Sequence, residues 1–220
     1  MKRLLSVEVF FDFVCPWCLI GKRQLQRALE RLREEQPDVE VSLTWQGVQL
    51  LPELPAGGVP FAEFYRRRLG SEQAVLQRQR QVREAASLVG EAIDFGTIAR
   101  MPNSADAHRL LQRAARVGSA QQVEALLERL FAAYFHRGED IGDRATLLDI
   151  AQGCGLPSEA LADVLLGDGS PFINAGAGMA ANGVPCFVFD QHLYLSGAQS
   201  PEVLLGALRA ALARSAGVGA

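Results

Sequence analysis

The 220-residue sequence has little of several things that mark common protein classes. Four cysteines are too few for a small disulfide-bonded scaffold. Three histidines have no metal-ligand spacing among themselves. The net charge of −3 gives no indication of a basic nucleic-acid-binding surface. No apolar run approaches the roughly 18 residues of a membrane span. We therefore expect no nucleic-acid partner and no membrane partner.

The N-terminal stretch lacks the pattern of a secretory signal peptide. Lys2 and Arg3 precede apolar residues, but Glu8 and Asp12 interrupt the stretch and no small-residue cleavage site follows. We expect a cytoplasmic protein, in a compartment where most thiols are kept reduced. A cysteine pair there is more often catalytic or redox-sensing than structural.

Such a pair is present in Cys15-Pro16-Trp17-Cys18. The apolar run 4–13 before it predicts a strand, and the run 18–32 after it predicts an amphipathic helix. A C-x-x-C motif between a strand and a helix is typical of a redox dithiol. Residues three apart on a helix are neighbours, so the two side chains can meet.

The start of a helix also favours reactivity at the first cysteine. Unpaired N–H groups and the positive end of the helix dipole stabilise a thiolate at Cys15. Pro16 suits the first turn, where a missing N–H costs nothing. The thiolate is the nucleophile of thiol–disulfide exchange, so we predict that Cys15 attacks and Cys18 resolves.

Half of a zinc site and a purely structural pair are the alternatives for this motif. Zinc sites normally show a second cysteine pair, whereas Cys154 and Cys186 lie far apart and have no nearby histidine. The sequence therefore predicts no metal site.

The rest of the chain alternates between strand and helix patterns. A strand is predicted over 39–46, and the Pro/Gly-rich segment 52–60 is expected to be a loop. From about 61 to 166 the pattern is helical throughout, with one helix beginning near Pro157. Strands over 184–189 and 193–196 predict a hairpin.

A final helix is expected after Ser200 as N-cap and Pro201 in the first turn. This order fits the α/β class, with a helical insertion in an α/β domain. We place the domain boundaries at 1–60, 61–170 and 171–220.

Three motifs, in order along the chain, resemble the DsbA family of the thioredoxin fold, and its FrnE-like branch in particular. They are segment 12–22, segment 101–108 with its Met-Pro-Asn-Ser start, and segment 183–199 with its Gly-Val-Pro start. The resemblance implies a thioredoxin-like fold built from 1–60 and 171–220, with a helical insertion over 61–170. It also implies a protein disulfide oxidoreductase.

The resemblance gives Val184 and Pro185 a role in substrate binding. It implies a cis bond before Pro185 and a Val184 backbone that pairs with an extended substrate as an added strand. An ordinary trans proline at a strand start is the alternative.

Trp17 departs from the histidine that the periplasmic oxidases of this superfamily carry between their cysteines. An indole cannot supply the hydrogen bonds or charge of an imidazole. The direction of electron transfer therefore stays open.

Three further residues each allow two roles. Asp12 could position the helix start or assist proton transfer to Cys18, or it could be a polar turn residue. His108 is expected to pack or cap within the insertion, with a catalytic role as the alternative. Cys186 is a core residue or a third redox thiol.

We predict a thiol–disulfide oxidoreductase that acts on protein or small thiol substrates. No cofactor is expected, although glutathione could be an exchange partner, and the protein would be a monomer or homodimer. One alternative is a glutathione-dependent transferase or isomerase of the kappa or chromene-carboxylate type. Those relatives have serine in place of Cys15, and the kappa enzymes have Ser-Asp where this chain has Ala198-Gln199. The other alternative is a redox-switched binding protein, or holdase.

Overall fold

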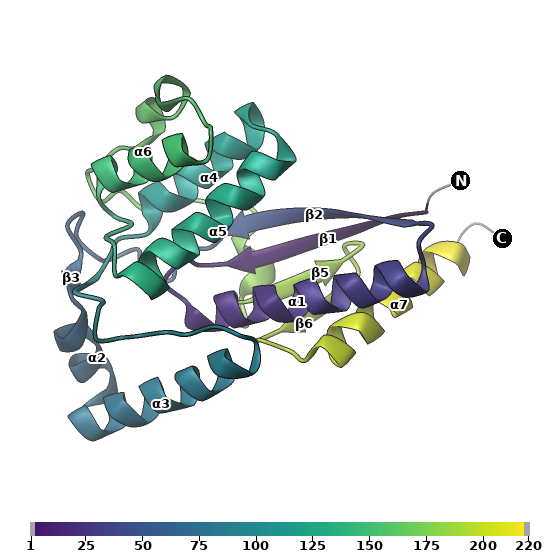
Figure 1. The fold of residues 1–220 in the computed structure, drawn as a ribbon, viewed down its shortest axis with the longest axis horizontal. Coiled ribbons are helices and arrows are strands. Elements are labelled where there is room, and N and C mark those ends of the chain that lie inside the picture. The colour runs from purple at the N-terminus through teal and green to yellow at the C-terminus, as the bar shows by residue number, and fades with distance from the viewer. Residues whose placement is uncertain (1–2, 218–220) are drawn as a thin grey trace. The chain divides into compact units, whose positions relative to one another are not determined.

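The computed structural model of the protein describes residues 3–217, with side chains as far as Arg214. Its elements, in chain order, are β1 (Arg3–Phe11), α1 (Pro16–Glu35), β2 (Val39–Gly47), β3 (Val59–Pro60), α2 (Phe61–Leu69), α3 (Glu72–Leu88), β4 (Arg100–Met101), α4 (Ala105–Val117), α5 (Ala120–Arg137), α6 (Arg144–Gly153), the 3₁₀ turns η1 (Ser158–Ala160), η2 (Ala162–Val164) and η3 (Ala177–Ala180), β5 (Cys186–Phe189), β6 (Leu193–Ser196) and α7 (Pro201–Gly217) (Figure 1). They form two compact units. The sheet unit comprises residues up to 11, 17–48 and from 174 on, and the helical unit comprises 12–16 and 49–173.

The sheet unit contains a four-stranded sheet in the order β2-β1-β5-β6. β1 and β2 are parallel, with Val7 opposite Leu43, whereas β5 is antiparallel to β1, with Phe189 opposite Val7. Parallel neighbours need a crossover, and α1 supplies it. β5 and β6 form the expected hairpin. Asp190 and Gln191 turn it with positive φ angles of 47° and 61°.

Helices α1 and α7 cover the same face of this sheet. The residues that pack together there come from alternate positions of β1 and β5 and from one side of each helix: Leu5, Val7, Val9, Leu25, Ala28, Leu29, Leu32, Phe187, Phe189, Leu204, Leu205, Ala207, Leu208, Ala211 and Leu212. Alternation in the strands and three-to-four spacing in the helices are the patterns that bury one face of each element. This packing fixes the axis of α1, and with it the direction in which its N-terminal end points.

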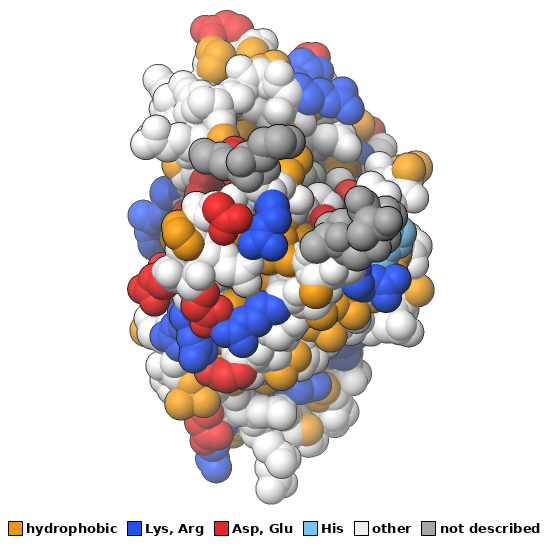
Figure 2. All heavy atoms as spheres, turned by 90° about the vertical axis from the view of Figure 1, so that its right-hand side faces the viewer, with side chains coloured by type: hydrophobic (Ala, Val, Ile, Leu, Met, Phe, Trp, Pro, Cys, Tyr) orange, Lys and Arg blue, Asp and Glu red, His pale blue; other side chains and the backbone are white. Residues whose placement is uncertain are grey.

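Ion pairs join the exposed sides of α1 and α7. Arg31 lies 2.8 Å from Glu202, and Arg209 lies 2.6 Å from Glu35. Figure 2 shows basic and acidic side chains interspersed on the face it views. Exposed pairs of this kind contribute about 0–1 kcal/mol each, so apolar packing holds the two helices in place.

The helical unit is built around α4, α5 and α6. The buried side of α5 carries Leu126, Leu127, Leu130, Phe131, Ala133, Tyr134 and Phe135. A capping box at Ser119 begins α5, and Gly138 ends it with a φ of 63°. Both termini follow the usual N-cap and C-cap chemistry.

Two expectations for segment 61–166 were wrong in detail. The segment is not helical throughout, because the chain between α3 and α4 is extended in part and β4 pairs with β3, Met101 opposite Val59. The helix expected near Pro157 is replaced by η1 and η2.

The second difference has a physical reason. Arg113 donates to the carbonyl of Ala160 at 3.2 Å, and Arg144 donates to that of Leu165. Side chains from α4 and α6 therefore donate hydrogen bonds to backbone carbonyls that would otherwise accept hydrogen bonds within a helix. A helix this short is marginal by itself.

The predicted α/β class with a helical insertion between β2 and β5 is confirmed. The strands expected over 39–46 and 193–196 are present with nearly the same bounds. Ser200 Oγ accepts the N–H of Val203 at 3.4 Å, as an N-cap of α7 does. The domain boundaries at 60 and 170 stay a prediction.

A glycine on α1 tests this packing. A Cβ added at Gly21 would lie 2.9 Å from Pro185 Cγ and 3.2 Å from Phe187 Cζ. We expect Gly21→Ala to lower the free energy of unfolding by about 1–2 kcal/mol in urea titrations, because overpacking outweighs the gain in helix propensity. Gly206→Ala on α7 is the matched control, since nothing lies within 4 Å of its added Cβ. It should stabilise the protein slightly, and equal effects at both sites would contradict the packing.

Candidate active site

The dithiol lies where β1 gives way to α1. Cys15 directly precedes Pro16, the first residue of α1, and Cys18 lies in the first turn. Cys15 is 8% exposed and Cys18 is 1% exposed, while Pro16 and Trp17 are half-buried. Cys15 is therefore the more accessible thiol of the pair, as an attacking nucleophile needs to be.

The start of α1 is a suitable place for a thiolate. The helix has 20 residues, and its first turn contains no acidic residue. The unpaired N–H groups and the dipole of this terminus attract negative charge. Cys15 directly precedes α1 and Cys18 is its third residue, a spacing that suits the Cα separation of about 4.4–6.8 Å that a disulfide requires.

Asp12 shapes the turn that presents Cys15. Its carbonyl accepts the N–H of Cys15 at 3.2 Å. Its carboxylate, which is fully buried, accepts the N–H of Val14 at 3.3 Å on Oδ1 and that of Leu50 at 2.7 Å on Oδ2. The structure thus brings together Asp12 and Cys15 and adds the loop after β2, which the sequence did not connect to them.

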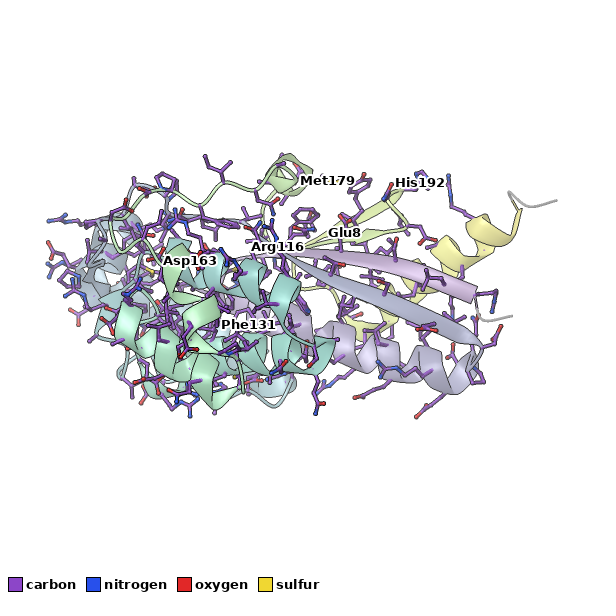
Figure 3. All side chains as sticks on the ribbon, turned by 90° about the horizontal axis from the view of Figure 1, so that it is seen from above. Glu8, Arg116, Phe131, Asp163, Met179 and His192 are labelled. Carbon is purple, nitrogen blue, oxygen red and sulfur yellow. The ribbon has the colours of Figure 1, made fainter. Side chains whose placement is uncertain are left out.

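His108 completes the surroundings of Asp12. It lies in the first turn of α4, and its Nε2 is 3.1 Å from Asp12 Oδ1, with both side chains fully buried. The imidazole is 5.0 Å from the ring of Phe13 and 5.2 Å from that of Phe172. Phe13 in turn packs 5.3 Å from Phe131 of α5, which Figure 3 labels. His108 packs within the helical unit, as predicted, but its contact with Asp12 was not predicted from the sequence.

Two tyrosines lie close to these groups and were missed in the sequence. Burial, and after it the charge of a Cys15 thiolate, raises the pKa of Tyr65 to about 12. Burial also raises the pKa of Tyr134 well above its usual value, with smaller contributions from the charges of Tyr65, Asp12 and Asp140. Both phenols are therefore neutral near pH 7. Aromatic residues on the helices of an insertion carry no sequence signal that would separate them from core residues.

A buried cation lies further along α1. Lys22 is 1% exposed, and its ammonium group is 5.5 Å from the centre of the Trp45 ring. It follows Cys18 by four residues, so both are on one side of α1.

Val184 and Pro185 belong to the sheet unit, directly before β5. The peptide bond between them is cis. Pro185 packs against Gly21, which lies one turn after Cys18. The Pro185 carbonyl accepts the N–H of Gly197 at 2.7 Å, which ties the loop to the end of β6.

Cys186 points away from this contact. Successive side chains of a strand face opposite sides of the sheet. Phe187 packs with α1, whereas Cys186 packs with Phe10, Ala180 and Val188 on the other face. Burial raises the pKa of the Cys186 thiol. The geometry favours the core role over that of a third redox thiol.

The second motif of the sequence has a structural centre in Asn103. Its amide nitrogen donates to the carbonyl of Leu54 at 2.7 Å, and its oxygen accepts from Gln49 Nε2 at 2.8 Å and from the N–H of Ala105 at 3.0 Å. Asn103 therefore ties the loop after β2 to the start of α4, the two segments that supply Leu50 and His108.

Among the residues that the structure describes, no group of three or more His, Cys, Asp or Glu side chains could hold a metal ion. Within residues 3–217 no helix is both long and apolar enough to cross a membrane.

Comparison with known proteins places this site in a family. The family model for the DSBA-like thioredoxin domain matches residues 6–209. The chain therefore belongs to the DSBA-like thioredoxin domain family, and its fold is thioredoxin-like.

Solved structures agree with this assignment. The chain is 28% identical to a "probable DsbA oxidoreductase" from Streptomyces coelicolor, with a TM-score of 0.80 over 94% of this chain and 89% of that one. It shares its fold with the cytosolic disulfide reductase DsbM from Pseudomonas aeruginosa with GSH, at 17% identity, a TM-score of 0.58 and coverage of 94% and 96%. It also shares its fold with a 2-hydroxychromene-2-carboxylate isomerase, at 13% identity, a TM-score of 0.62 and coverage of 97% and 98%.

The burial of Cys186 predicts selective labelling. A raised pKa leaves less thiolate at a given pH, and the thiolate is the form that reacts. We expect brief iodoacetamide treatment of the native protein at pH 8, read by peptide mass spectrometry, to label Cys15 well before Cys186. In denaturant the two should react alike. Early labelling of Cys186 in the folded protein would restore it as a redox candidate.

Removal of Asn103 should destabilise the fold. Asn103→Ala leaves buried partners unsatisfied, which costs about 2–3 kcal/mol of unfolding free energy. Urea unfolding measures the change. Asn182→Ala, at an exposed position, is the matched control and should have little effect. A loss below about 0.5 kcal/mol at Asn103 would show that these hydrogen bonds contribute little.

Proposed function

We propose that the chain is a thiol–disulfide oxidoreductase that exchanges disulfides with protein or low-molecular-weight thiol substrates through Cys15 and Cys18. The position of the dithiol carries this proposal. Cys15, a residue that is 8% exposed, directly precedes a 20-residue helix, and Cys18, which is 1% exposed, follows in its first turn. Membership of the family supports the same activity.

The chemistry needs only the two thiols and a substrate. In the reducing direction the Cys15 thiolate attacks one sulfur of a substrate disulfide, forms a mixed disulfide and releases the other substrate sulfur, which takes up a proton. The Cys18 thiolate then attacks the Cys15 sulfur, releases the second substrate thiol and leaves a Cys15–Cys18 disulfide. Two electrons pass from the protein to the substrate, and an external thiol pair restores the dithiol. In the oxidising direction the steps run in reverse.

We assign the remaining predicted residues to substrate contact and to support of the dithiol. Pro16 and Trp17 form the half-exposed surface between the cysteines. Val184 and Pro185 receive an extended substrate as an added strand. The contact of Pro185 with Gly21 of α1 supports this role. Asp12 shapes the turn before Cys15.

We further propose glutathione as an exchange partner and the cytoplasm as the site of action. The similar fold of the cytosolic reductase that was solved with GSH supports both. No metal or organic cofactor is required, since the electrons come from the thiols themselves.

A glutathione-dependent isomerase is the second candidate, because the chromene-carboxylate isomerase shares this fold. Such an enzyme would hold glutathione without forming a mixed disulfide. Retention of the protein on immobilised glutathione after alkylation of Cys15 would favour this candidate over exchange.

Single cysteine variants test the proposal. With glutathione disulfide as the probe, Cys15→Ser should abolish exchange, because the attacking thiolate is lost. Cys18→Ser should accumulate a glutathione adduct on Cys15, visible by mass spectrometry, because no thiol resolves it. Cys154→Ser is the control and should exchange at the rate of the unaltered protein. Full turnover by Cys18→Ser would refute the dithiol mechanism.

A further inference from the structure

A groove on the helical unit has no part in the exchange steps above. Its volume is about 370 Å³, and it is lined by side chains of α4 and of the segment from Asp163 to Ile173. Neither Cys15 nor Cys18 lines it. Binding sites for small molecules have volumes of about 300–1,000 Å³, so the groove has room for one.

Buried side chains of α4 hold the segment that borders this groove. The carboxylate of Asp106, a residue that is 6% exposed, accepts the N–H groups of Leu166 at 3.1 Å and Gly167 at 2.8 Å. Arg109 Nη2 donates to the carbonyl of Ser170 at 2.6 Å. Segment 163–173, all of which the structure describes, contains no helix beyond the end of η2 and no strand. Hydrogen bonds to α4 therefore keep the groove in shape before any ligand arrives, as is usual for ligand sites.

The polar side of the groove carries excess positive charge. Arg109, Arg113 and Arg116 follow each other at intervals of four and three residues, which puts them on one side of α4. Arg109 lies 2.7 Å from Asp106, and Arg113 lies 2.9 Å from Asp163. Arg116 is exposed and has no ion-pair partner among the residues that the structure describes. Figure 3 labels Arg116 on α4 and Asp163 on η2. Three arginines face two aspartates, so one positive charge is left over.

The remaining side chains that line the groove are apolar. They are Val164, Leu166, Phe172 and Ile173. Leu166 is 52% exposed, and Ile173, at 86%, is the most exposed large apolar side chain in the described part of the chain. Single exposed apolar residues need no explanation, but several beside one groove are typical of a binding surface. A ligand that matches both sides has an apolar body and one negative charge.

We propose that this groove binds a small aliphatic carboxylate, with its carboxylate on Arg113 and Arg116 and its chain along Leu166 and Ile173. Residues three apart on a helix are neighbours, so both guanidinium groups can reach one carboxylate. Arg113 donates only two hydrogen bonds, to Ala160 and to Asp163, and a guanidinium has five N–H groups. Guanidinium N–H groups form charge-assisted hydrogen bonds that match the two oxygens of a carboxylate.

A pair of matched probes tests the proposal on the full chain. Octanoate carries the negative charge, and octanamide has the same chain without it. By isothermal titration calorimetry we expect octanoate to bind in a saturable way and octanamide to bind about tenfold more weakly, because the amide forms no charge-assisted hydrogen bond. In ¹H–¹⁵N NMR spectra, octanoate should shift the amide signals of α4 and of segment 163–173. A lack of saturable octanoate binding, equal affinity for both probes, or shifts confined to other segments overturns the proposal.

Three variants at exposed positions separate the two sides of the groove. Arg116→Gln should weaken octanoate binding about fivefold and leave octanamide binding unchanged. Ile173→Ser should weaken the binding of both probes by the same factor, because the chain loses an apolar contact. Arg33→Gln, in the last turn of α1, is the matched control and should change neither affinity.

Octanoate binding that is unaltered in Arg116→Gln, or weakened as much in Arg33→Gln, contradicts the proposal. These measurements use no disulfide substrate, so their failure is distinct from a failure of the proposed exchange reaction.

Discussion

The buried carboxylate of Asp12 is the interaction on which the candidate site depends. Its two oxygens accept the N–H groups of Val14 and Leu50, and its Oδ1 lies 3.1 Å from His108 Nε2. Its carbonyl accepts the N–H of Cys15. The loop after β2 and the first turn of α4 are thereby fixed to the turn that precedes the dithiol. A buried acceptor with this many partners rigidifies the structure only while all of them are in place. Asn103 contributes to the same arrangement, because it holds that loop to the start of α4.

The sheet unit holds α1, the helix whose first turn contains Cys18, against its sheet. Alternate residues of β1 and β5 pack against one side of α1, and α7 packs beside it. Cys18 and Gly21 lie on this helix, and Gly21 has no side chain because Pro185 occupies the space. A site built on an anchored helix holds its geometry better than one on a mobile loop. The helix terminus also attracts negative charge without any side chain.

Much of this could be predicted from the sequence. Alternation predicted β1, β2 and the hairpin, three-to-four spacing predicted α1 and α7, and the C-x-x-C spacing located the dithiol. The contact between Asp12 and His108 could not be predicted, because the two residues are 96 positions apart and hydrophobic periodicity does not show which distant residues meet. A weak signal existed: Asp12 lies between Phe11 and Phe13, and His108 falls on the apolar side of an amphipathic helix. The 3₁₀ turns after Pro157 could not be predicted either, because they depend on hydrogen bonds that arginines from other helices donate to backbone carbonyls of this segment.

The residue between the two cysteines supplies no charge to the dithiol in this chain. Trp17 occupies that position and offers neither a charge nor an imidazole hydrogen bond. The positive influence on the dithiol comes instead from the terminus of α1. A thiolate stabilised in the reduced form makes a dithiol more oxidising, and one that is opposed by negative charge makes it more reducing. In this chain the terminus of α1, whose first turn contains no acidic residue, favours a thiolate at Cys15 without any side chain between the cysteines.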